Sequence, residues 1–176
     1  MRIIHVIDTN IFSFLLGVKG TPRADLTIES VKEKIKAIDE KGETIVIPLP
    51  VMIETGNQLT NSSTNKEEKC QNMIELIERQ FDNKRPWHSF SEQNIFWEKE
   101  NLRKILNVWH EQVNSINFGD FLIIALAAYL KEEYRQRGDY EVLLWTEDNN
   151  ALKAFEGTEF NFIFERNEIS KRRKVR

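Results

Sequence analysis

Short apolar runs alternate with longer amphipathic stretches along the chain. Residues 2–8 form a run of Ile, Val and His that ends at Asp8, and residues 44–48 and 140–146 form two more such runs. Short runs rich in β-branched or aromatic residues, without helical spacing, predict buried strands. The segment FNFIF at residues 160–164 is a candidate fourth strand.

The stretches between these runs have the apolar spacing of helices. Residues 26–41 are amphipathic, Thr9 and Asn10 can cap a short helix after the first strand, Pro50 suits the start of another, and residues 119–137 form the most apolar one. Strands that alternate with helices predict an α/β fold. We expect a three-layer α/β/α arrangement with a central, mainly parallel sheet of four or five strands.

The region from residue 57 to residue 118 has helical patterns and no predicted strand. The chain has 176 residues, which fits one domain, so we predict a single domain over residues 1–165 with a helical insertion at about 57–118. Aromatic residues gather in this insertion. They could be its own core, a stacking surface for bases or a groove for a partner's helix, and the core role is favoured. These aromatic residues are Trp87, Phe90, Phe96, Trp97 and Trp109.

Composition excludes several classes of protein. A single cysteine, Cys70, rules out an internal disulfide framework and suits a reducing compartment. The N-terminal apolar run is interrupted too early, at Asp8, for a signal peptide, and the longest apolar run is about half the ~20 residues that a membrane span needs. We therefore expect a cytoplasmic protein with no membrane partner.

Charge is distributed unevenly. The net charge is −3, but residues 166–176 hold six basic residues and one acid, which leaves the first 165 residues with 19 basic and 27 acidic residues. An acidic body with a basic tail indicates a polyanionic partner. The alternative is a solvated tail without a binding role, because short charged tails are common.

Four acids occupy positions that could meet at one edge of the sheet. Asp8 ends the first strand, Glu54 lies in the first turns of the helix after the second, and Asp148 follows the third. Asp120 opens the long apolar helix. Ligands of open parallel sheets bind beyond the carboxyl ends of the strands. Glu147 is adjacent to Asp148 and is a rival for its role.

Clustered carboxylates repel one another unless a cation or retained protons compensate their charge. Oxygen ligands suit Mg²⁺ or Mn²⁺, which bind phosphate oxygens and activate water. The set therefore predicts a metal centre suited to phosphodiester hydrolysis. Taken singly, each acid could instead be a helix cap or a solvated surface residue.

Four segments resemble the acidic motifs of PIN-domain nucleases. They are VIDTN at 6–10, PLPVMIETG at 48–56, NFGDFLIIALA at 117–127 and WTEDNNAL at 145–152. The resemblance implies a PIN-like α/β/α fold, Mg²⁺ or Mn²⁺ dependence and cleavage of RNA. It carries over Asp8, Glu54, Asp120 and Asp148 as catalytic metal ligands, and suggests that Asn10 and Thr146 orient them through hydrogen bonds.

The leading hypothesis is a metal-dependent endoribonuclease, of the toxin type or for RNA processing, with Arg172, Arg173 and Lys174 of the tail as candidate RNA contacts. Many small PIN proteins are toxins of toxin–antitoxin pairs, so an inhibitory antitoxin-like protein is a candidate partner, as is a second copy of the chain. This chain is longer than is usual for such toxins. The alternatives are a non-catalytic PIN-like scaffold that binds RNA or protein, and a DNA-directed structure-specific nuclease.

Overall fold

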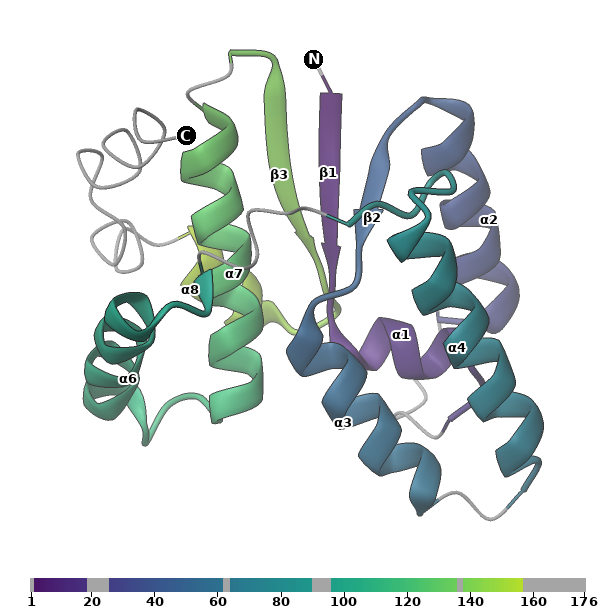
Figure 1. The fold of residues 1–176 in the computed structure, drawn as a ribbon, viewed down its shortest axis with the longest axis horizontal. Helices are drawn as coiled ribbons and strands as arrows, with labels where there is room; N and C mark the ends of the chain where they lie inside the picture. Colours follow the sequence, from purple (N-terminus) through teal and green to yellow (C-terminus); the bar gives the residue numbers. More distant parts are fainter. Residues whose placement is uncertain (1, 19–25, 62–63, 90–95, 136–137, 157–176) are drawn as a thin grey trace.

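A parallel sheet lies at the centre of the computed structural model, which describes residues 2–18, 26–61, 64–89, 96–135 and 138–156. Its strands are β1 (Arg2–Ile7), β2 (Thr44–Val46) and β3 (Tyr140–Trp145), in the order β2-β1-β3. β1 pairs with β3 from Arg2 opposite Tyr140 to Ile7 opposite Trp145. All three strands therefore end at the same edge (Figure 1).

The central strand is covered on both faces. Ile4, His5, Val6 and Ile7 are all buried, and successive residues of a strand point to opposite faces of the sheet. α7 packs against β3 and α2 against β2, and Figure 1 shows these helices on opposite sides of the strands. Helices on both faces are what the predicted α/β arrangement requires.

Helices fill the rest of the described chain, close to the predicted positions. They are α1 (Thr9–Leu15), α2 (Ile28–Glu40), α3 (Leu49–Thr60), α4 (Lys66–Phe81), α6 (Lys99–Gln112), α7 (Phe118–Arg135) and α8 (Asn149–Glu156). The cap of α1 was predicted wrongly. Thr9 and Asn10 are already helical, and the preceding Asp8, in extended conformation, accepts the capping hydrogen bond from the Ile11 amide.

The sheet has three strands within the described residues, fewer than the four or five predicted. The candidate strand at 160–164 and the basic tail at 166–176 both lie outside the described residues. No helix in the described part of the chain is both long and apolar enough to cross a membrane.

The insertion covers the β2 edge of the sheet. Gln80 of α4 is buried, and its side-chain amide accepts from the Ile47 amide at 2.5 Å and donates to the Ile47 carbonyl at 3.1 Å. Trp87 forms an isolated parallel bridge with Ile45, so the insertion adds a bridge to the sheet although it adds no described strand. These contacts satisfy backbone groups that an open strand edge would expose.

The aromatic residues of the insertion are packed into the structure. Trp87 and Phe96 are buried, and Phe96 contacts both Trp97 and Tyr129 of α7. Trp109 packs against Phe118 with a ring separation of 4.7 Å. The core role is therefore confirmed for Trp87 and Phe96, whereas Trp97 and Trp109 are half-buried against the core and Phe90 lies outside the described residues.

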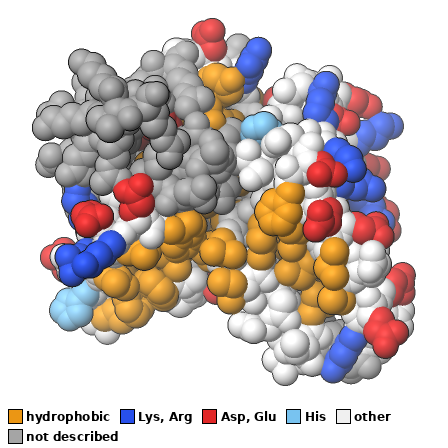
Figure 2. All heavy atoms as spheres, in the orientation of Figure 1, with side chains coloured by type: hydrophobic (Ala, Val, Ile, Leu, Met, Phe, Trp, Pro, Cys, Tyr) orange, Lys and Arg blue, Asp and Glu red, His pale blue; other side chains and the backbone are white. Residues whose placement is uncertain are grey.

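α6 lies at the surface and is not a core helix. It buries Asn101 and Ile105, whereas Leu106 and the capping residue Val113 are exposed. Figure 2 shows hydrophobic side chains on this face of the molecule, over α6 among other elements. Isolated exposed apolar side chains are normal at protein surfaces. The position of α6 leaves its C-terminal end free to border the site described next.

Candidate active site

Asp8 is fixed between a helix and the neighbouring strand. It follows β1 directly, and its Oδ1 accepts from the Ile11 amide at 2.8 Å, which caps α1. Its Oδ2 accepts from the hydroxyl of Thr146, the residue after β3. Both side chains are buried, at 8% exposure. The parallel pairing of β1 and β3 brings these two residues together, although 138 positions separate them.

Asp148 is tied to the same hydroxyl. Its backbone amide donates to Thr146 Oγ1 at 2.9 Å, while its Oδ1 accepts from the Asn150 amide at 2.7 Å and so caps α8. Asp8, Thr146 and Asp148 line one small pocket. Glu147 is not among the residues that line it; its charge acts instead on Lys34 of α2. The geometry thus favours Asp148 over Glu147 as the acid that faces the site.

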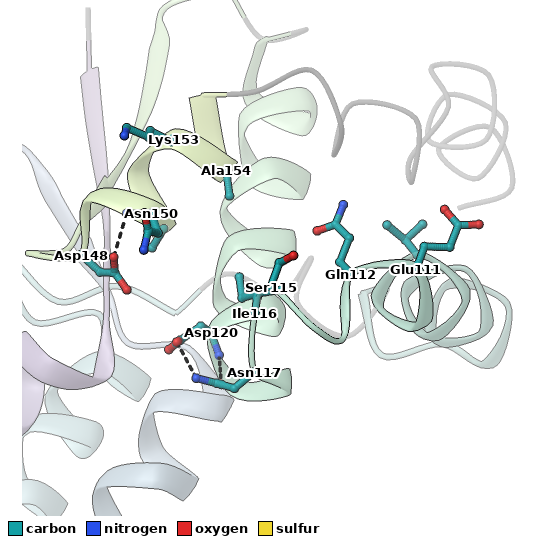
Figure 3. Close-up of a pocket in the computed structure, with 12 residues that line it drawn as sticks. Glu111, Gln112, Ser115, Ile116, Asn117, Asp120, Asp148, Asn150, Lys153 and Ala154 are labelled. Atoms are coloured by element: carbon teal, nitrogen blue, oxygen red, sulfur yellow. Dashed lines mark hydrogen bonds between the residues drawn. The ribbon is translucent and has the colours of Figure 1, made fainter.

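Asp120 lies in the first turn of α7, where Asn117 holds it in two ways. Asn117 Oδ1 accepts from the Asp120 amide at 2.9 Å, and Asn117 Nδ2 donates to Asp120 Oδ2 at 2.6 Å. This reciprocal pair satisfies an amide at the start of the helix and fixes the carboxylate. Figure 3 shows Asp120 and Asp148 facing the same space from two different elements.

Glu54 reaches the site from α3, in contact with α1 and α7. The Thr9 hydroxyl donates to Glu54 Oε2 at 2.5 Å. On the other side lies Gly119: a Cβ added there would be 1.8 Å from Glu54 Oε1. The carboxylate therefore occupies space that any residue other than glycine at position 119 would fill.

The four acids are coupled electrostatically. Burial, together with the charge of Asp120, raises the pKa of Asp8 to about 6, against the lowering effect of its hydrogen bonds. The pKa of Asp120 is also raised, by burial first and then by the charges of Glu54 and Asp148. No cation among the described residues lines the small pocket. The site therefore carries negative charge that retained protons or an added cation would compensate.

Three of the acids lie at helix N-termini. Asp8 caps α1, Asp120 is in the first turn of α7, and Asp148 caps α8. The partial positive charge of a helix N-terminus favours a carboxylate there. This explains how the fold tolerates the cluster, although the raised pKa values indicate that the compensation is incomplete.

The residues predicted to orient the acids or to contact RNA differ in whether the structure places them at the site. Thr146 bonds Asp8, as expected for a residue that orients a ligand. Asn10 is exposed and lines the small pocket, but within the described residues its side chain has no hydrogen bond to any of the four acids. Arg172, Arg173 and Lys174 lie outside the described residues.

Three contact residues were not singled out by sequence reasoning: Thr9, Asn117 and Gly119. Each stands within three positions of one of the acids. Asn117 carried a usable signal, because Asn followed three positions later by an acid resembles a capping box. Thr9 and Gly119 stand in two of the segments that resemble PIN motifs, but no local pattern indicated their contact with Glu54, which belongs to another helix.

Comparison with known proteins gives one match. A family model described as PIN domain matches residues 5–156, a range that includes all four acids. No curated protein and no solved structure matches the chain.

Proposed function

Because the chain belongs to the PIN-domain family, whose members are generally nucleases, we propose that it is a metal-dependent endoribonuclease. The observation that carries this proposal is the convergence of Asp8, Glu54, Asp120 and Asp148, whose mutual charges help to raise the pKa of Asp8 and Asp120. A protein keeps such a cluster at a cost to stability. The binding of a catalytic cation would explain why the protein keeps these four acids close together.

The donor atoms suit Mg²⁺ or Mn²⁺. Among the described residues, the lining of the small pocket presents carboxylate and hydroxyl oxygens and neither thiolate nor imidazole, which is the ligand set that these hard cations prefer. We assign Asp8, Glu54, Asp120 and Asp148 as the residues that would hold the metal. When bound, the ion lowers the pKa of a water molecule and neutralises charge on the phosphate.

The neighbouring residues keep the carboxylates in place. Thr146 bridges two acids, since it donates to Asp8 and accepts from the Asp148 amide. Thr9 orients Glu54, and Asn117 orients Asp120. Hydrogen bonds of this kind set the direction of ligand lone pairs before a metal or substrate arrives.

The carboxylates do not form a closed cage. Among the described residues, no group of three or more His, Cys, Asp and Glu side chains is arranged to hold a metal by itself. Mg²⁺ typically keeps several waters and takes one or two carboxylates together with phosphates of the substrate. An open arrangement therefore fits an ion that is shared with RNA.

The test is cleavage of end-labelled RNA and DNA by the full chain with Mn²⁺, with Mg²⁺ and with EDTA. We expect RNA cleavage that EDTA abolishes and that Asp8→Asn and Asp120→Asn each reduce at least 100-fold, while both variants keep the wild-type circular dichroism spectrum. Glu33→Gln on α2, an exposed acid of no assigned role, is the matched control and should retain activity. Full activity in EDTA or in Asp8→Asn contradicts the proposal.

The same preparation separates the alternatives. A non-catalytic scaffold gives no cleavage and no rise in melting temperature with Mn²⁺, whereas a bound ion stabilises the folded state. A DNA-directed nuclease cleaves the DNA substrate and leaves RNA intact. We further propose that the enzyme acts in the cytoplasm, which its single cysteine suits.

A further inference from the structure

A groove of about 880 Å³ adjoins the four acids. Asp120 and Asp148 line both this groove and the small pocket, so the groove opens directly onto the site. One wall is α8, and the other is the C-terminal end of α6 with the turn that leads into α7 (Figure 3). The volume lies within the roughly 300–1,000 Å³ of sites that enclose a drug-sized molecule, which matches about one or two nucleotides.

The α8 wall is firmly attached to the body. Ala151 and Phe155 are buried, and the ammonium group of Lys131 on α7 lies 4.9 Å from the centre of the Phe155 ring. Asn150, Lys153 and Ala154, spaced three and four residues apart, line the groove. This spacing places them on one face of the helix.

The opposite wall comes from the insertion, and Trp109 fixes it. Its indole Nε1 donates to the Ile116 carbonyl at 3.2 Å, and its ring packs on Phe118. The Ser115 and Ile116 amides both donate to the Gln112 carbonyl, which closes the turn. The turn therefore holds Ser115 and Ile116 at fixed positions beside Asp120.

Lys153 is the only cation among the described residues that line the groove. It is exposed, and it forms no ion pair with another described residue. It comes five positions after Asp148, which corresponds to roughly 7.5 Å along the helix axis at ~1.5 Å per residue. The backbone of Lys153 thus lies more than one helical turn beyond Asp148, and its long side chain can reach a phosphate beside the one at the acids.

The two walls offer what an unpaired nucleotide needs. Ser115 and Asn150 supply a hydroxyl and an amide for the edges of bases or for the ribose, and Ile116 and Ala154 supply apolar surface. In a duplex the base edges are engaged in pairing, so protein groups recognise RNA sequence mainly in single strands. The single lysine, in a groove that Glu111, Asp120 and Asp148 also line, fits one phosphate with its nucleotide.

We propose that this groove binds the single-stranded RNA on one side of the scissile phosphate, with Lys153 pairing to the adjacent phosphate. The inference rests on the proposed function. It gives the helical insertion a role as one wall of the substrate groove. It also makes RNA binding depend strongly on one lysine, since Glu111, Asp120 and Asp148 repel phosphates elsewhere along the groove.

The test measures binding without cleavage. The full chain carrying Asp8→Asn is titrated into a fluorescein-labelled single-stranded RNA of ten nucleotides in Mg²⁺ at several salt concentrations, and anisotropy gives the Kd. Adding Lys153→Ala should raise the Kd about 5-fold in low salt and reduce the slope of log K against log salt by about 0.7, the value for one lost contact to a single strand. Lys153→Arg should restore both quantities.

Lys32→Ala is the matched control, an exposed lysine on α2 that does not line the groove. It should leave Kd and slope unchanged. Equal effects of Lys153→Ala and Lys32→Ala contradict the proposal that the groove binds RNA. Lys153-dependent binding that persists when the RNA is annealed to its complement contradicts the proposal that the groove binds single strands. Single-stranded DNA bound as tightly as RNA overturns the assignment to RNA.

Cleavage kinetics separate failure of the groove from failure of the proposed function. In the otherwise wild-type chain, Lys153→Ala should raise KM and leave kcat within about 2-fold, because the lysine does not touch the reacting atoms. A wild-type chain that cleaves no nucleic acid contradicts the proposed function. The binding titration then still tests whether the groove binds single-stranded RNA. A wild-type chain that cleaves RNA with a KM indifferent to Lys153 contradicts the groove alone.

Discussion

The carboxylate of Glu54 lies against the backbone of Gly119, so closely that a Cβ at position 119 would be 1.8 Å from its Oε1. The contact joins α3 to the N-terminal turn of α7, beside Asp120. Position 119 thus controls where Glu54 can be, although glycine has no side chain of its own to contribute.

Gly119→Ala should therefore displace Glu54 while the fold is retained. We expect cleavage to fall at least 10-fold, with little loss of melting temperature, because alanine favours a helix over glycine by about 1 kcal/mol and offsets part of the strain. Gly56→Ala on α3 is the control, since nothing lies within 4 Å of a Cβ there. It should be slightly stabilised and fully active. Equal activity of the two variants contradicts this role for Gly119.

Thr146→Val tests the hydroxyl shared by two acids. Valine keeps the shape but removes the donor to Asp8 and the acceptor of the Asp148 amide. Buried groups left without a partner cost about 1–3 kcal/mol, and losing a group that orients metal ligands typically lowers metal affinity or activity roughly 10- to 100-fold. Mn²⁺ titration and urea denaturation measure the two effects. Thr146→Ser should recover most of both, and failure to do so would assign the effect to packing.

The raised pKa of Asp8 predicts how stability changes with pH in metal-free protein. The folded-state pKa is about 6 against an ordinary value of 3.8, so the folded state retains a proton that the unfolded state releases first. The contribution of Asp8 to the free energy of unfolding is largest below the pKa of the unfolded state and is lost as pH rises through about 6. At ~1.36 kcal/mol per pKa unit, the loss is roughly 3 kcal/mol. The raised pKa of Asp120 acts in the same direction.

Asp8→Asn removes this titration and keeps a good helix cap. In EDTA, the free energy of unfolding of the variant should exceed that of the wild type by an amount that grows between pH 4 and pH 7 and is constant above. Urea denaturation across this range measures the difference. A difference that is the same at every pH would show that Asp8 ionises in the folded state as it does in water.

The choice between the two neighbouring acids after β3 can be made directly. Asp148→Asn should abolish cleavage, because this residue faces the pocket and its amide derivative still caps α8. Glu147→Gln should leave cleavage within about 2-fold, since Glu147 acts on Lys34, whose ammonium lies 4.3 Å from the centre of the Trp145 ring. The reverse pattern in the same RNA assay would make Glu147 the ligand.

Sequence patterns were sufficient for the parts of the site that depend on strand ends. Asp8 and Asp148 could be placed because each follows an apolar run, and parallel strands end at one edge of the sheet. Asp120 could be placed because it precedes the most apolar helix. An apolar run locates the end of its strand to within a few residues, which is enough to place an acid near that end, although the cap of α1 was missed by one residue.

Contacts between elements were not predictable in this way. The approach of Gly119 to Glu54 depends on how α3 and α7 pack, and no local pattern encodes that distance. The role of Trp109 could not be predicted for the same reason. Its aromatic ring indicated that it would pack against the core, but no local pattern indicated that its indole would hold the turn beside the acids. The described residues contain three of the four or five predicted strands, and the candidate strand at 160–164 stays a prediction, because a β-rich segment shows propensity without showing a pairing partner.

The central position of β1 also determines when the site can form during synthesis. β1 leaves the ribosome before β2 and β3, so it can pair with β2 early, but its other edge waits for β3, and Asp8 waits for Thr146, 138 positions later. A nascent chain that has emerged only as far as α6 lacks both Asp120 and Asp148. Under the proposed ribonuclease function, this order of assembly means that the messenger RNA under translation meets all four acids together only after α7, β3 and Asp148 have emerged.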